Sequence, residues 1–118
     1  MAGVEIRDFT APDETRSPDK TTVELVNLAG GQIGRYTFQP GWRWSECIKP
    51  VVGTDRCQVE HIGYVVSGRL HVTHEDGSEN EAKGGDVYRI APGHDAWVVG
   101  DESAVFVEFQ GAANYAKG

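Results

Sequence analysis

Three of the residues best suited to metal binding lie in two β-rich stretches of this 118-residue chain. Cys57 and His61 stand four residues apart within residues 55–68, where β-branched and aromatic residues favour an extended strand. Side chains at this spacing on a strand point to the same face. His94 follows a second strand-like segment, residues 86–90, after an Ala-Pro-Gly break. Two β segments that each carry such a donor indicate a shared site.

A cysteine thiolate and imidazole nitrogens are ligands that suit zinc or iron in proteins. Cys57, His61 and His94 are therefore the candidate metal ligands, with Cys47, water or substrate at a fourth position. Asp55 is a further candidate, although a Thr-Asp pair is equally typical of a turn. An alternative stays open, in which Cys57 is a small buried apolar residue and His61 is a hydrogen-bonded core histidine.

The elements that must position these residues are short strands separated by turn signals. The signals are glycine-containing pairs at Gly30-Gly31, Pro40-Gly41, Ser67-Gly68, Asp76-Gly77 and Gly84-Gly85. We predict strands over residues 21–28, 32–38, 42–48, 56–66, 69–74, 86–90, 97–99 and 104–109. The stretch 49–54 is predicted to be a loop and 78–83 at most an edge strand, and no helix longer than one turn is expected.

This pattern predicts one all-β domain over residues 21–110. Residues 1–20 alternate poorly and carry two prolines and several charges, so we predict an N-terminal arm there. Residues 111–118 are small and polar and are predicted to form a C-terminal tail.

The two β-rich stretches resemble the paired sequence motifs of the cupin superfamily, small β-barrels of the jelly-roll type. The first family motif reads G-x5-H-x-H-x3,4-E-x6-G, and the second reads G-x5-P-x-G-x2-H-x3-N. In this chain His61 and Gly68 have the spacing of E-x6-G, and Gly85 and Gly93 fall on glycines of the second motif. The resemblance spans residues 41–110 and implies a cupin-type jelly-roll β-barrel.

The chain departs from the family's usual set of three histidines and one glutamate. When the motif glycines are aligned, the first two histidines fall on Asp55 and Cys57, and the glutamate falls on His61. The histidine of the second motif falls on Ala96, while His94 stands two residues earlier. The resemblance therefore implies a rearranged set of donors inside the barrel.

The chain is also similar to a subgroup of short, single-domain bacterial cupins with a PGHDAWVVG signature, which residues 92–100 match. Small cupins are commonly dimers, so the resemblance implies a homodimer. The apolar arm residues Val4, Ile6 and Phe9 are candidates to contribute to its interface.

Composition limits the partners and the compartment. The net charge is 11 − 18 = −7, which argues against binding to nucleic acid. We find no phosphate loop and no dinucleotide motif, so no nucleotide cofactor is expected. No apolar run approaches the roughly 20 residues of a membrane span. Two cysteines make no disulfide framework, and no secretory signal is visible, so we expect a cytoplasmic protein.

Two classes of function fit these residues. In the first, the barrel encloses a small-molecule ligand in a non-catalytic or sensory role, with or without a divalent transition metal such as zinc or iron. Trp44, Tyr64 and Trp97 are candidates to line that pocket. In the second, a metal-dependent enzyme of the isomerase, lyase or oxygenase type acts on a small organic substrate, with His61 or His94 as ligand or acid-base group. The rearranged donors favour the first class slightly.

Overall fold

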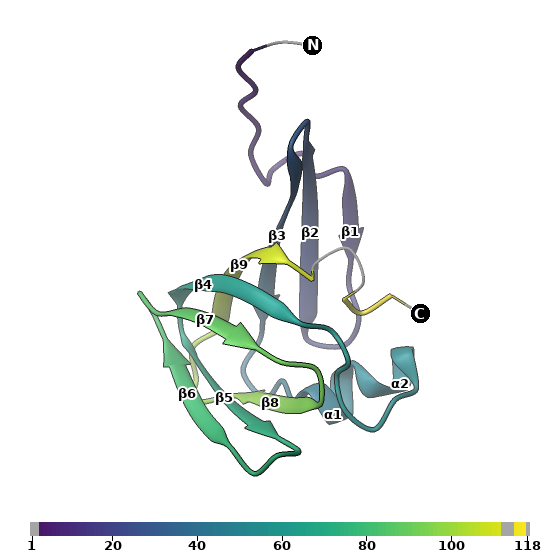
Figure 1. Ribbon diagram of the computed structural model, residues 1–118, viewed down its shortest axis with the longest axis vertical. Helices are drawn as coiled ribbons and strands as arrows, with labels where there is room; N and C mark the ends of the chain where they lie inside the picture. Colours follow the sequence, from purple (N-terminus) through teal and green to yellow (C-terminus); the bar gives the residue numbers. More distant parts are fainter. Residues whose placement is uncertain (1–2, 112–114, 118) are drawn as a thin grey trace.

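Residues 3–111 and 115–117 are described by the computed structural model, and within them the chain forms two antiparallel β-sheets and two single-turn helices (Figure 1). The larger sheet has six strands in the order β1-β2-β3-β9-β4-β7, and the smaller has three in the order β6-β5-β8. The all-β fold predicted from the sequence is confirmed.

The strands of both sheets are short, as the spacing of the turn signals predicts. In the larger sheet they are β1 (Glu14–Arg16), β2 (Thr21–Leu28), β3 (Gly31–Phe38), β4 (His61–Ser67), β7 (Val87–Ile90) and β9 (Ala104–Gln110). In the smaller sheet they are β5 (Arg69–His74), β6 (Glu79–Lys83) and β8 (His94–Val98). The hairpins β2–β3 and β5–β6 form where Gly30-Gly31 and Asp76-Gly77 predict them. β1 lies within the predicted arm and pairs with β2.

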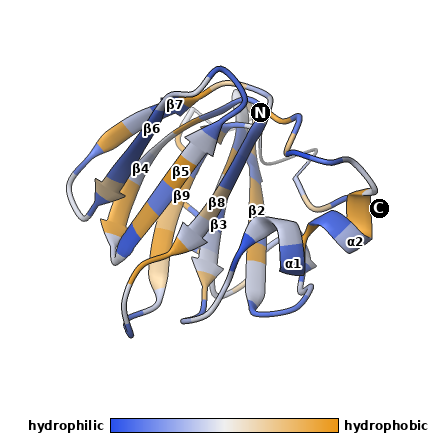
Figure 2. Cartoon of the chain, turned by 90° about the horizontal axis from the view of Figure 1, so that it is seen from below, coloured by the Kyte–Doolittle hydropathy of each residue, from blue (hydrophilic) through white to orange (hydrophobic). Residues whose placement is uncertain are grey.

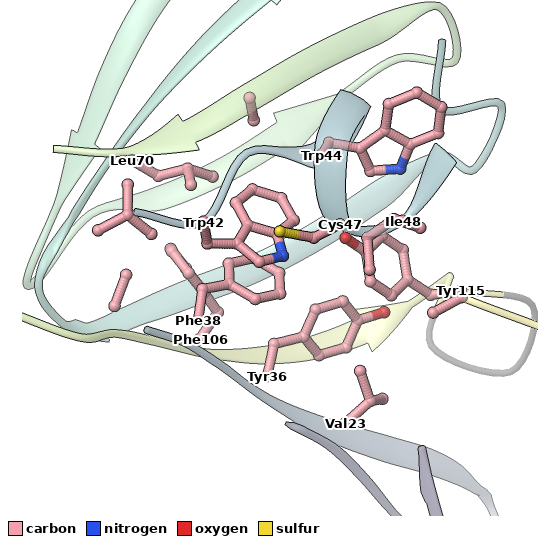
Figure 3. Packing of buried hydrophobic residues seen from close by; sticks show 14 of the residues in the cluster. Val23, Tyr36, Phe38, Trp42, Trp44, Cys47, Ile48, Leu70, Phe106 and Tyr115 are labelled. Atoms are coloured by element: carbon pink, nitrogen blue, oxygen red, sulfur yellow. The ribbon is translucent and has the colours of Figure 1, made fainter. Parts of the chain in front are cut away.

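Alternation along the strands divides each sheet into a buried and an outer face. Hydrophobic and hydrophilic residues follow one another along the strands in Figure 2. Tyr36 and Phe38 of β3 point into the core with Phe106 of β9, and Trp42 stacks on Phe38 with ring centroids 3.8 Å apart (Figure 3). The indole N–H of Trp42 donates a hydrogen bond to the Thr21 hydroxyl at 2.9 Å. This aromatic layer fills the space between the sheets.

The predicted strand over residues 42–48 is wrong. The chain instead forms helix α1 (Trp44–Cys47), followed directly by helix α2 (Lys49–Val52) in place of the predicted loop. Trp44, Cys47 and Ile48 are buried, and their spacing is that of one helix face. Gly53 ends α2 in the left-handed conformation with φ of 79°, which glycine adopts without steric cost.

Strand boundaries near the candidate ligands also differ from the prediction. β4 begins at His61 rather than at residue 56, and Cys57 forms an isolated bridge with His94. His94 is the first residue of β8 rather than part of a loop before it. Among the described residues, neither helix has the length or apolar character needed to cross a membrane.

Candidate metal centre

The fold brings Cys57, His61 and His94 together in the interior. One potential ligand atom from each lies within 4.8 Å of the others, and all three residues are buried. Cys57 is fixed beside His94 by backbone hydrogen bonds, since its N–H donates to the His94 carbonyl at 2.8 Å and its own carbonyl accepts from Gly93 at 2.7 Å. These three residues form a group that could hold a metal ion.

The His61 imidazole is held between a carboxylate and the thiol. Its Nδ1 lies 2.6 Å from Oε1 of Glu108, and its Nε2 lies 3.7 Å from Sγ of Cys57. Glu108 is 4% exposed, so this is a buried contact. In the neutral ring, an Nδ1–H bonded to a carboxylate leaves the lone pair of Nε2 directed at the thiol.

His94 is oriented in the same way by the backbone. Its Nδ1 donates to the carbonyl oxygen of Ala91 at 2.8 Å, which leaves Nε2 as the free ring nitrogen. The His61 and His94 rings meet edge to face with centroids 5.1 Å apart. Both imidazoles therefore keep Nδ1 for support and have Nε2 available as a ligand.

Glu108 is itself supported by a tyrosine two strands away. The Tyr88 hydroxyl on β7 donates to Oε2 of Glu108 on β9 at 2.6 Å, across β4. Gly63 of β4 pairs with both residues, and a Cβ at this position would stand 2.6 Å from the Tyr88 hydroxyl. The tyrosine reaches the carboxylate because the strand between them carries a glycine here.

The electrostatics favour a thiolate beside an imidazolium. Burial alone raises the pKa of the Cys57 thiol, but hydrogen bonds and charge from His61 and His94 outweigh it and lower this pKa to about 6. Burial likewise lowers the pKa of His61, but the charge of Glu108, together with hydrogen bonds to Cys57 and Glu108, raises it to about 9. A cation that binds this buried pair would displace one proton from it into the solvent.

The separation of Cys57 and His61 fits a tetrahedral transition-metal ion. With bonds of about 2.3 Å to sulfur and about 2.0 Å to nitrogen, a zinc ion separates such ligands by about 3.5 Å. The Cys57–His61 separation of 3.7 Å is close to this value. Imidazole ligands of metal sites are typically supported through their second nitrogen by a carboxylate or a backbone carbonyl. Glu108 and Ala91 supply these supports.

His61 and His94 line a small cavity of about 30 Å³. By the volume that one water molecule needs, it has room for about two. Its lining is largely aromatic and includes Tyr36, Trp44, Phe106 and Tyr115 beside His61. A larger hollow of about 750 Å³ lies on the β6 and β7 side of the molecule, and the two share the wall residues Ala82, Tyr88 and Ile90.

The three aromatic residues predicted to line a ligand pocket are placed differently from one another. Trp44 lines the cavity. Tyr64 does not, because it stands three residues after His61 on β4 and so points to the outer face, where it is 40% exposed. Trp97 is also outside the cavity lining and stacks on His71, with ring centroids 4.7 Å apart, while Arg43 covers the Trp97 ring.

The two further candidate donors lie apart from the group of three. Asp55 is fully exposed and pairs with Lys49 at 3.4 Å. Cys47 is buried on α1, with its Sγ 3.7 Å from a carboxylate oxygen of Asp19. Both cysteines are free thiols.

Sequence reasoning missed the residues that surround the donors. Glu108 shares strand parity with the buried Ala104 and Phe106, so a carboxylate on the core face was a signal that could have found it. Tyr115 packs on His61 with ring centroids 5.3 Å apart and is buried, although it lies in the predicted polar tail. No local pattern marks a single tyrosine after Gly111 as part of the core.

Comparison with known proteins identifies solved structures with a similar fold. No protein-family model and no curated protein matches the chain. A protein of unknown function from Rhizobium leguminosarum bv. viciae is similar at a TM-score of 0.63 and 21% identity, covering 92% of this chain and 99% of that one. KdgF from a Halomonas species gives a TM-score of 0.60 at 19% identity, covering 91% of each chain.

Oxalate decarboxylase from Lactobacillus farciminis is also similar, with a TM-score of 0.60 and 12% identity over 94% of this chain and 35% of that one. At such identities the likeness shows the fold alone. The chain is a small cupin-fold protein with a buried Cys-His-His group, and the cupin-type jelly roll predicted from the sequence is confirmed. Membership of the PGHDAWVVG subgroup stays a prediction.

Proposed function

We propose that this protein binds a divalent transition metal through Cys57, His61 and His94 and uses it to hold a small-molecule ligand inside the barrel. The observation that carries the proposal is the convergence of three buried donor atoms within 4.8 Å, two of them imidazole nitrogens.

Zinc or iron is the proposed ion. A thiolate with two imidazoles is a donor set of intermediate softness, which disfavours magnesium and calcium. Structural zinc sites usually have four protein ligands, whereas sites that bind a substrate have three and an open position. The described residues supply three at this point. This count supports a ligand-binding ion, and a non-catalytic or sensory role is the function that we favour.

A metal-dependent enzyme of the isomerase, lyase or oxygenase type is the second candidate. The connected hydrogen bonds from Tyr88 through Glu108 to His61 support it, because such a chain can hold and move a proton beside the ion. The ion would polarise a carbonyl or enolate oxygen when bound. The hollow beside β6 and β7, which shares Tyr88 with the cavity, would receive a larger substrate.

Metal binding is tested by measuring the ion content of the purified protein by mass spectrometry, after exposure to zinc, iron, nickel and copper. We expect one ion per chain in the wild type and a large loss in Cys57→Ser, His61→Ala and His94→Ala. Cys47→Ser and His71→Ala are matched controls, because they remove the same donor types away from the group, and they should keep the ion.

The metal content of these proteins distinguishes the possible explanations. A wild-type protein that takes up none of the four metals contradicts the proposal. A His61→Ala variant with undiminished metal and native circular dichroism would place the ion elsewhere. A metal-loaded protein that turns over no candidate substrate, but binds one, favours the sensory function over the enzyme.

A further inference from the structure

Two buried hydrogen-bond donors that face the cavity lack a well-formed hydrogen bond to the described residues. The indole nitrogen of Trp44 has no partner among them, and the hydroxyl of Tyr36 has only the carboxylate of Glu108 in its vicinity, although both side chains are 1% exposed. Both residues line the cavity beside His61 and His94. Figure 3 shows both polar ends turned into the interior on the side of Tyr115. A buried donor without an acceptor destabilises the fold, so these groups indicate a ligand or trapped water.

The chemistry of these two groups defines the kind of partner that they need. The indole N–H of Trp44 can only donate. The hydroxyl of Tyr36 can donate a hydrogen bond as well. Each oxygen of Glu108 already has one hydrogen-bond partner, His61 at Oε1 and Tyr88 at Oε2. A ligand in this cavity must therefore supply hydrogen-bond acceptors.

The volume of the cavity limits the class of ligand further. The cavity of about 30 Å³ has room for about two water molecules, so a ligand there has only a few heavy atoms. Apart from these two donors and the metal-binding group, aromatic and aliphatic side chains dominate the lining, as with Phe106 and Leu70. An anion in such surroundings needs both the charge of an ion and direct hydrogen bonds.

We infer that the cavity binds a small oxyanion of the size of a short carboxylate, with one oxygen at the open position of the metal and hydrogen bonds from Tyr36 and Trp44. This inference rests on the metal centre proposed above and adds the class of ligand and two residues that recognise it. Tyr36 and Trp44 are positioning residues for this ligand.

The probe is formate, titrated into the protein loaded with cobalt(II), whose visible spectrum reports a new ligand on the ion. We expect saturable binding of formate and none of benzoate, which exceeds the cavity. Tyr36→Phe removes one hydroxyl and keeps the ring, so it should take up cobalt normally and weaken formate binding about ten- to hundredfold, as expected for a hydrogen bond to a charged group. Tyr64→Phe, on the outer face, is the matched control and should bind formate like the wild type.

A measurement on the wild type needs no substitution in the core. In the zinc-loaded protein, formate should shift the indole N–H resonance of Trp44 and leave that of Trp97 unmoved, since Trp97 lies outside the cavity lining. Trapped water as the only partner predicts no response to formate in either experiment and overturns the inference.

The metal centre and its proposed ligand can be contradicted separately. Cobalt uptake with no effect of formate, or equal formate affinity in Tyr36→Phe and the wild type, leaves the metal centre intact and overturns the inference about its ligand. Absence of metal uptake overturns both.

Discussion

Glu108 is the residue on which the orientation of the proposed centre depends. Its carboxylate lies 2.6 Å from the His61 ring and thereby favours the tautomer whose Nε2 faces Cys57 at the proposed metal position. Supporting groups of this kind typically change metal affinity by about 10- to 100-fold when they are altered. A substitution here should therefore affect metal binding without touching a ligand.

Glu108→Gln should weaken zinc binding about tenfold or more, because an amide lacks the negative charge that raises the basicity of His61. Competition with a chromophoric chelator measures the change. Glu60→Gln is the control, because Glu60 is near the surface and pairs with Arg89 at 3.1 Å. The zinc affinity of this variant should equal that of the wild type. Equal affinities in all three proteins would show that the carboxylate has no role at the centre.

The pKa values of Cys57 and His61 set the pH dependence of metal binding. Between about 6 and 9, Cys57 is already a thiolate and His61 still carries a proton that the ion must displace. Affinity should therefore rise about tenfold per pH unit in this window and more steeply below it, where Cys57 is protonated too. Calorimetry in buffers of different ionisation enthalpy should find about one proton released per ion at pH 7. Affinity that is flat across the window would contradict the thiolate–imidazolium pair.

At the scale of elements, β4 positions the site by alternating a ligand and a glycine on one face. His61 presents its ring to the cavity, and Gly63 leaves the space through which Tyr88 reaches Glu108. The outer face of the same strand carries the exposed Tyr64. The strand therefore separates the site from the surface by side-chain parity alone.

Gly63→Ala should destabilise the fold by about 1–3 kcal/mol, as overpacking typically does, because the new methyl group meets the Tyr88 hydroxyl and the Val107 carbonyl. Urea denaturation measures the loss. Gly30→Ala is the control, since a Cβ there meets nothing within 4 Å, and it should stay within about 0.5 kcal/mol of the wild type. A Gly63→Ala variant as stable as this control would mean that Tyr88 has room to move aside.

The same elements show what the sequence could and could not predict. Hairpins at Gly30-Gly31 and Asp76-Gly77 follow from local turn chemistry, which fixes the path of a few residues. The segment 42–48 fits two periods at once, since Trp42 and Trp44 alternate like a strand while Trp44, Cys47 and Ile48 follow a helical face. Packing against β8 decides between them, and packing is not visible in local sequence.

The proximity of Cys57, His61 and His94 was predictable for a different reason. Cys57 and His61 share strand parity, and the cupin resemblance placed His94 near them. Glu108 and Tyr115 come from segments more than 40 residues away from His61 in sequence. Their contacts depend on the register of β9 against β4 and on the path of the C-terminal segment, which the sequence pattern does not fix.

At the scale of the whole molecule, the outer face of the larger sheet carries an unusual apolar row. Tyr64 of β4 pairs with Val87 on one side and Val107 on the other, and Val87 is 79% exposed. Val66 and Phe109 extend the row on β4 and β9. Contiguous exposed apolar surface of this kind is typical of protein interfaces.

We propose that a second copy of the chain covers this face in a two-fold homodimer, consistent with the dimer expected from the cupin resemblance. Light scattering should give twice the 12.9 kDa chain mass. Tyr64→Glu should shift the protein to the monomer, because it places a charge at the centre of the row. Thr73→Glu, on the smaller sheet, is the control and should remain dimeric. A wild-type monomer at micromolar concentration would contradict the proposal.

The most direct test of the central claim is the anomalous diffraction of crystals of the zinc-loaded protein, collected on both sides of the zinc absorption edge. We expect a single strong anomalous peak between Sγ of Cys57 and the Nε2 atoms of His61 and His94. The Nδ1 atoms of the two rings should remain hydrogen-bonded to Glu108 and Ala91. A peak at any other residues, or a zinc-soaked crystal with density at these three side chains but no anomalous signal, would contradict the claim.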